Sequence, residues 1–206
     1  MRTRLVGILA SALVVPALAA TSVIATAQQP PSDSASSRSS SSSSMSSAGT
    51  SSSNPVSDAL RESLKRAESN LVAAAKEMPA RKYSYAPTPA QMSFGKLVLH
   101  VAGANNFMCA TISGSKAPER SKLEPGDAKD KLVSELEQSF QYCHTALANL
   151  TDDNLGAEVP FFGGRKISRA AAVLGLAEDW GDHYSLAATE LRLNGLLPPT
   201  AQRGEQ

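Results

Sequence analysis

The sequence has few aromatic residues, only two cysteines and no excess of charge of either sign. The 20 lysines and arginines are balanced by 19 aspartates and glutamates, so charge gives no reason to expect a nucleic acid or an anionic membrane as partner. Two cysteines cannot build a four-cysteine zinc site. A glycine-rich phosphate loop and a nucleophile elbow are also missing, which removes the usual signatures of nucleotide and serine-hydrolase chemistry.

The first 27 residues have the pattern of a secretory signal. Arg2 and Arg4 precede an uncharged apolar run, and the Ala-Thr-Ala triplet at 25–27 forms a small-x-small cleavage site before Gln28. We therefore expect residues 1–27 to be removed, the mature protein to be exported to the periplasm or beyond, and no integral membrane span to remain. The alternative is a retained anchor, because the uncharged stretch is long enough to span a bilayer.

A serine tract follows the signal. Between Ser32 and Ser53, 15 of the 22 residues are serine. Such a segment has almost no apolar surface to offset the entropy lost on ordering, so we expect residues 28–53 to form a disordered linker.

The remaining domain, residues 54–199, is expected to be all-α. Apolar residues recur at spacings of three and four over about 54–78, 94–113, 127–150 and 168–194, and nothing in the domain has the pattern of a strand. Four amphipathic helices with short to medium connections predict a four-helix bundle. Residues 200–206 are expected to be a disordered tail. Apolar positions of the fourth helix include Leu174, Leu176, Leu186, Leu191 and Leu193.

Three segments resemble a known family of helical proteins. Residues 93–105 read SFGKLVLHVAGAN, residues 139–150 read SFQYCHTALANL, and His183-Tyr184 is followed by LRLNG at 191–195 and by two prolines. In order and separation, these segments are similar to the second, third and fourth helices of the DinB-like superfamily. The resemblance extends over nearly all of the expected domain.

The resemblance implies a divalent metal site made by three histidines, one on the second helix and two on the fourth helix at a spacing of four. This chain matches that pattern at His100 and His183, but Asp179 stands where the remaining histidine is expected. Two histidines and a carboxylate also form a known open ligand set, for which zinc, nickel, iron or manganese are candidates. The alternative is that Asp179 only pairs with His183. Glu178 and Asp182 are candidates to orient a histidine from outside the ligand set.

Cys109 and Cys143 are expected to form a disulfide, because exactly two cysteines in an exported chain invite pairing. Two buried free thiols are the alternative. The third histidine, His144, follows an apolar position and is expected at the surface.

Three functions remain open from the sequence. The first is a metal-dependent transferase using a thiol cosubstrate, as in characterised members of the family. The second is a bundle that binds a metal or a small-molecule ligand without catalysis. The third is a structural or interaction module whose metal site has decayed. Homodimers are common among such bundles.

Overall fold

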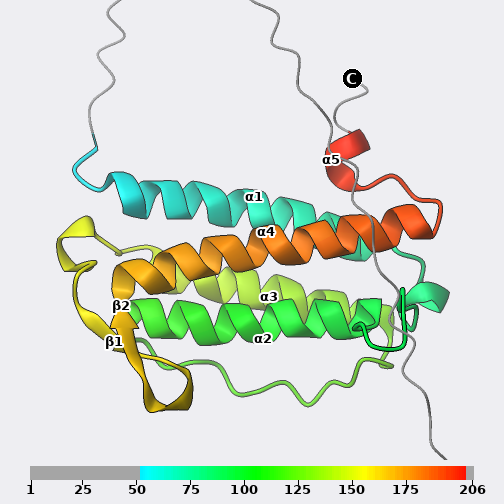
Figure 1. Cartoon of the computed structure of the whole chain (residues 1–206), viewed down its shortest axis with the longest axis horizontal. Helices are drawn as coiled ribbons and strands as arrows, with labels where there is room; N and C mark the ends of the chain where they lie inside the picture. Colours follow the sequence, from blue (N-terminus) through cyan, green and yellow to red (C-terminus); the bar gives the residue numbers. More distant parts are fainter. Residues whose placement is uncertain (1–51, 203–206) are drawn as a thin grey trace, which may run out of the picture. The chain divides into compact units, whose positions relative to one another are not determined.

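The computed structural model describes residues 52–202. The expected signal and most of the expected serine linker lie outside the described residues. Within them, four long helices lie side by side (Figure 1), as the sequence predicts: α1 (Pro55–Glu77), α2 (Phe94–Ser113), α3 (Lys129–Leu147) and α4 (Arg169–Leu193). Each packs mainly on two neighbours, which gives the order α1, α4, α2, α3 around the bundle. None of the described helices is both long and apolar enough to cross a membrane.

The helices α2 and α3 run in the same direction. Asn105 donates to Ser139, and Cys109 is bonded to Cys143, so both pairs advance by four residues along both helices. The connection 114–128 therefore returns along the length of the bundle (Figure 1), and it is longer than the connections expected from the sequence. It begins at Gly114, whose φ of 75° closes α2 in the left-handed region that favours glycine.

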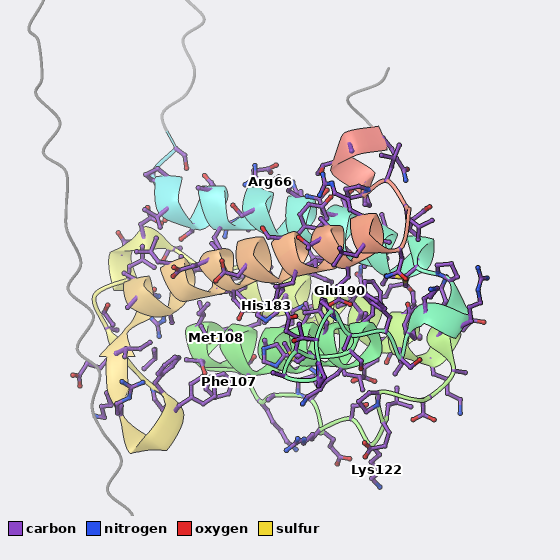
Figure 2. All side chains as sticks on the ribbon, turned by 45° about the vertical axis from the view of Figure 1, so that its right-hand side comes forward. Arg66, Phe107, Met108, Lys122, His183 and Glu190 are labelled. Carbon is purple, nitrogen blue, oxygen red and sulfur yellow. A yellow bond between two sulfur atoms is a disulfide. The ribbon has the colours of Figure 1, made fainter. Side chains whose placement is uncertain are left out.

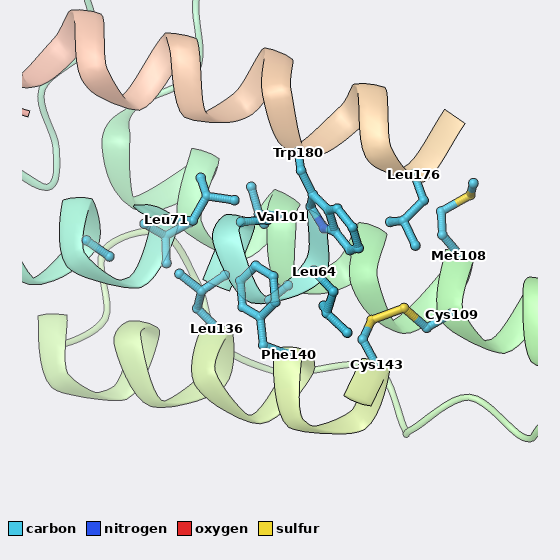
Figure 3. Packing of buried hydrophobic residues seen from close by; sticks show 14 of the residues in the cluster. Leu64, Leu71, Val101, Met108, Cys109, Leu136, Phe140, Cys143, Leu176 and Trp180 are labelled. Atoms are coloured by element: carbon cyan, nitrogen blue, oxygen red, sulfur yellow. A yellow bond between two sulfur atoms is a disulfide. The ribbon is translucent and has the colours of Figure 1, made fainter. Parts of the chain in front are cut away.

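A buried chain of hydrogen bonds fixes the register of three helices. The indole nitrogen of Trp180 on α4 donates to Asn105 Oδ1 on α2 at 2.7 Å, and Asn105 Nδ2 donates to Ser139 Oγ on α3 at 3.0 Å. Ser139 Oγ in turn donates to the Leu136 carbonyl. Trp180 and Phe140 pack in the centre of the core (Figure 3).

The first turn of α1 is capped by a residue from a distant segment. Asn54 makes no capping hydrogen bond with its side chain. Asp152 instead accepts from the Val56 and Ser57 backbone N–H groups at 2.9 and 2.8 Å, while Asn54 Oδ1 accepts from the Asp152 backbone N–H. The free donors at the start of α1 are thus satisfied by a residue nearly a hundred positions away, which joins α1 to the end of α3.

The expectation of no strand is wrong for one short segment. After the 3-10 turn η2 (Asp152–Asn154), β1 (Glu158–Pro160) pairs with β2 (Lys166–Ser168) in an antiparallel hairpin around η3 (Phe162–Gly164). Gly163 and Gly164 have positive φ and permit the tight reversal. The hairpin folds onto α2 through Phe161 and Phe162, whose rings contact Phe107.

Two further expectations need correction. Leu174, Leu186 and Leu193 are 67%, 40% and 57% exposed, because α4 carries apolar residues all round and the core takes only one side. Three residues of the expected tail, 200–202, belong to the short helix α5 (Pro199–Gln202), where Thr200 bonds the Tyr184 hydroxyl. The remaining 3-10 turn, η1 (Ala80–Lys82), follows α1.

Candidate metal site

His100, Asp179 and His183 lie together at the contact between α2 and α4. One ligand atom from each falls within 4.8 Å of the other two. The i, i+4 spacing places Asp179 and His183 on one side of α4, one turn apart. The His100 ring reaches them from α2, with 4.7 Å between the centroids of the two imidazoles. In Figure 2 His183 lies between the ribbons of α4 and α2.

His100 is exposed, although it lies within a helix of largely apolar residues. Its neighbours Leu97 and Val101 do enter the core. His100 is turned away from them by about a third of a helical turn, toward the edge of α2 that meets α4. Burial therefore does not oblige this imidazole to find a polar partner, and its proximity to α4 is the stronger indication of a site.

The proton on His183 is located by one hydrogen bond. His183 Nδ1 lies 2.7 Å from the backbone carbonyl oxygen of Asp179. A carbonyl can only accept, so Nδ1 carries the proton and the Nε2 lone pair of the neutral ring is left for a metal. The backbone thus does the orienting that the sequence assigned to Glu178 or Asp182, and both of those carboxylates are exposed.

Asp179 has an oxygen without a hydrogen-bond partner. Its Oδ2 is buried, and it lies 3.4 Å from His183 Nδ1, within the range of an ion pair. This approach is an attraction between charges and not a directed hydrogen bond, because the Nδ1 proton points at the carbonyl. A buried carboxylate oxygen without a donor is costly unless a cation completes it.

The two histidines have opposite pKa shifts. Partial burial and the charge of His183 lower the pKa of His100. The nearby Asp179 carboxylate raises the pKa of His183, against the effect of burial, and the charge of Asp182 adds to the increase. His100 is therefore the more readily neutral of the two rings, whereas His183 holds its second proton more tightly, so that a binding metal competes with that proton.

The three residues fit a divalent ion. Two imidazole nitrogens and one carboxylate oxygen form an open ligand set that leaves positions for water or substrate. The fit depends on the Asp179 oxygen that lacks a hydrogen-bond partner and on His183 Nε2, which the bond from Nδ1 leaves as the ring's other nitrogen.

The other residues expected to matter are placed as follows. Cys109 and Cys143 form the expected disulfide, with 5.3 Å between their Cα atoms. His144 is less exposed than expected, because its Nε2 lies 2.7 Å from Glu68 on α1. Glu68 also lines a hollow of about 580 Å³ between α1 and α3, whose lining contains none of the three clustered residues.

Glu190 is a residue that the sequence analysis missed. It is 5% exposed, its Oε2 has no partner, and burial raises the pKa of its carboxyl to about 7. It follows His183 by seven residues, which is two turns along the same edge of α4. A charged residue at a core-facing position of the apolar repeat was the available signal in the sequence.

The fold and the cluster define a helical bundle whose second and fourth long helices share a candidate metal site. The sequence profile of the DinB superfamily matches residues 63–187, and the chain belongs to this superfamily. No curated protein matches the chain.

Three solved structures with the same fold are from bacteria. A DinB-like protein from Bacillus subtilis is 20% identical with a TM-score of 0.55, over 66% of this chain and 92% of its own. A DinB-like protein from Bacillus cereus is 15% identical with a TM-score of 0.58, over 69% and 95%. A conserved protein from Enterococcus faecalis is 16% identical with a TM-score of 0.54, over 67% and 96%. At these identities the likeness concerns the fold.

Proposed function

We propose that this protein is an exported member of the DinB superfamily that binds a divalent metal ion through His100, Asp179 and His183. The open positions of the ion would be presented to a small-molecule ligand. The observation that carries the proposal is the convergence of three ligand atoms from two helices within 4.8 Å. When bound, such an ion acts as a Lewis acid that polarises an oxygen of its ligand.

Each residue has a distinct part in the proposed site. His100 supplies a ring whose lowered pKa favours the neutral form that a metal needs. His183 supplies Nε2, held in place by the bond from Nδ1 to the Asp179 carbonyl. Asp179 supplies the anionic oxygen, and since the two histidines bind as neutral rings, a divalent ion would keep one net positive charge.

Metal content tests the proposal. Protein purified without chelator is expected to hold about one divalent ion per chain, measured by elemental analysis. Replacing His183 by Ala is expected to weaken binding by more than about 100-fold, since losing a ligand costs more than losing a partner of a ligand. His144→Ala is the matched control, because this third histidine pairs with Glu68 away from the cluster and its loss leaves the ion bound.

A decayed site is the second candidate, and the 3.4 Å approach of Asp179 to His183 favours it. In that case the two side chains neutralise each other without an ion, and His183→Ala lowers stability but leaves an already metal-free protein unchanged in metal content.

A thiol-dependent transferase is a narrower form of the first proposal. Turnover that requires both a low-molecular-weight thiol and the bound ion would establish it.

A further inference from the structure

An aromatic cluster lies on the same edge of α2 as His100. Phe107 follows His100 by seven residues, so it projects from the same side two turns further on, about 10 Å along the axis. The β1–β2 hairpin lays Phe162 against it, with the rings stacked at 4.1 Å and 20°. Phe161 adds a third ring, 6.0 Å from Phe107. Figure 2 shows Phe107 on the stretch of α2 that continues past His183.

The surface between the two clusters carries small side chains. A Cβ on Gly103 would meet nothing within 4 Å, so the space beside this turn of α2 is open. Ala104 lies one turn after His100. On α4, a Cβ at Gly175, one turn before Asp179, would contact only the Met108 methyl group at 3.8 Å. No bulky side chain from these positions separates the candidate metal site from the rings.

The aromatic cluster is incompletely covered. Phe162 is 57% exposed although its ring stacks on Phe107. Arg165 stands over the Phe161 ring at 5.6 Å, which adds positive charge at this end. The other end would carry the net positive charge of the ion. An exposed aromatic platform between two positive ends suits an anionic molecule with a flat apolar body.

We propose that His100, Ala104, Phe107 and Phe162, with Gly175 opposite, form one binding strip for a small aromatic molecule. Its anionic group ligates the metal, and its ring packs on the exposed side of Phe162, which Phe107 holds in place by stacking on the other side. The inference rests on the proposed metal site and deepens it by naming the class of ligand. The separation of about two helical turns sets the spacer, which is three or four bonds between the anionic group and the ring.

Two hydroxamates that differ only in the aromatic arm test the strip. Acetohydroxamate and 4-phenylbutanohydroxamate share one metal-binding group, and calorimetry on the zinc-loaded full chain measures both dissociation constants. The phenyl probe is expected to bind about tenfold more tightly, the gain typical of one stacked ring. Phe162→Ala should bring the ratio close to one, whereas Phe162→Tyr should keep it.

The controls separate this inference from the metal site itself. Leu193→Ala removes an apolar side chain that is 57% exposed near the end of α4, ten residues beyond His183, and should leave the ratio unchanged. Phe107→Leu keeps the apolar volume if Phe107→Ala loosens the hairpin, and it should still lower the ratio. Equal binding of both probes to zinc-loaded protein overturns the strip and leaves the metal proposal standing. Failure to take up zinc overturns both.

Discussion

Asp179 is the residue at which this chain departs from a three-histidine set. A carboxylate exchanges a neutral nitrogen donor for an anionic oxygen on a shorter side chain. Oxygen donors favour manganese and iron relative to nickel and zinc, when compared with imidazole. The Asp179 carboxylate also lies close to His183, so a bound ion and a protonated imidazole would compete for the same carboxylate oxygen.

Restoring the histidine should therefore change metal preference. We expect Asp179→His to raise affinity for nickel and zinc relative to manganese by at least about tenfold. Competition titrations on metal-free protein measure the ratio. Asp153→His places a histidine at an exposed position outside α2 and α4 and serves as control. An unchanged ratio in Asp179→His would mean that residue 179 does not touch the ion.

Glu190 gives a prediction about pH. Its folded pKa of about 7 lies above the ordinary value of 4.5, so the folded state holds this proton more tightly. The resulting stabilisation is complete below about pH 4.5 and is lost as the pH rises through 7. Glu190→Gln should abolish this fall and raise the free energy of unfolding at pH 8 by up to about 3 kcal/mol relative to the unmodified chain.

Urea unfolding at pH 5 and pH 8 measures the effect. Glu178→Gln, an exposed change on the same helix, should preserve the pH dependence of the original chain. If Glu190→Gln and the original chain lose stability in parallel between the two pH values, the carboxyl is ionised in the folded state and the assignment is wrong.

At the scale of elements, the start of α1 depends on the segment that follows α3. Asp152 caps α1, and Arg61 of α1 donates to the Leu147 and Leu150 carbonyls at the end of α3. Partial desolvation opposes ionisation of Asp152, but the hydrogen bonds from Ser57 and from the α1 backbone lower the pKa of its carboxyl overall.

Removing the Asp152 cap should destabilise the contact between the start of α1 and the segment after α3. Asp152→Ala is expected to lower the thermal midpoint by a few degrees at neutral pH. Because the folded pKa is depressed, the contribution is present above about pH 4 and disappears as the pH falls through the lowered value. The difference between the two proteins should therefore vanish in acid. Asp153→Ala, its exposed neighbour, should match the original chain at every pH.

The disulfide adds a covalent link between α2 and α3. Cys109 and Cys143 are separated by 34 residues, and closing a loop of this length stabilises a fold by roughly 3–4 kcal/mol in the chain-entropy model. The variant with Ala at both positions should lose about that much in urea unfolding. Thiol titration of the denatured, unreduced chain should find no free thiol, and two thiols per chain would refute the bond.

Periodicity predicted all four long helices, because each one buries a single stripe. It failed where a distant residue decides the outcome. Asparagine is a residue type that commonly caps helices, yet α1 is capped by Asp152, which belongs to another segment, and not by Asn54. The hairpin escaped notice because three-residue strands are too short to show alternation.

The candidate site was predictable in its residues but not in its surroundings. The spacing of four fixed Asp179 and His183 on one side of α4, and the resemblance supplied His100. Whether His100 would face the core or its edge depends on the rotation of α2 against α4, which periodicity leaves undetermined within about a third of a turn. Glu190 shows the same limit: its position in the apolar repeat was a signal, but the rotation of α4 decides whether its carboxyl is buried.

At the scale of the whole molecule, export remains a prediction, because residues 1–27 lie outside the described part of the chain. Mass spectrometry of protein from its native host should find an N-terminus at or near Gln28. The basic start is the element to vary: replacing Arg2 and Arg4 by Glu should leave the precursor uncleaved, while the same change at Arg81, within the domain, should not. An intact Met1 in the soluble cytoplasmic fraction would contradict the prediction.

The disulfide joins α2 to α3 and leaves α4 outside the covalent loop. Since α4 carries two of the three candidate ligands, an ion would fasten α2 to its other neighbour and act as a second, removable cross-link. Partial openings that swing α4 outward need break no covalent bond. Amide hydrogens of α4 should consequently exchange faster than those of α2 and α3, and added zinc should slow them selectively. The rate of ion release would then depend on how often α4 opens, and not on whether the disulfide between α2 and α3 is oxidised or reduced.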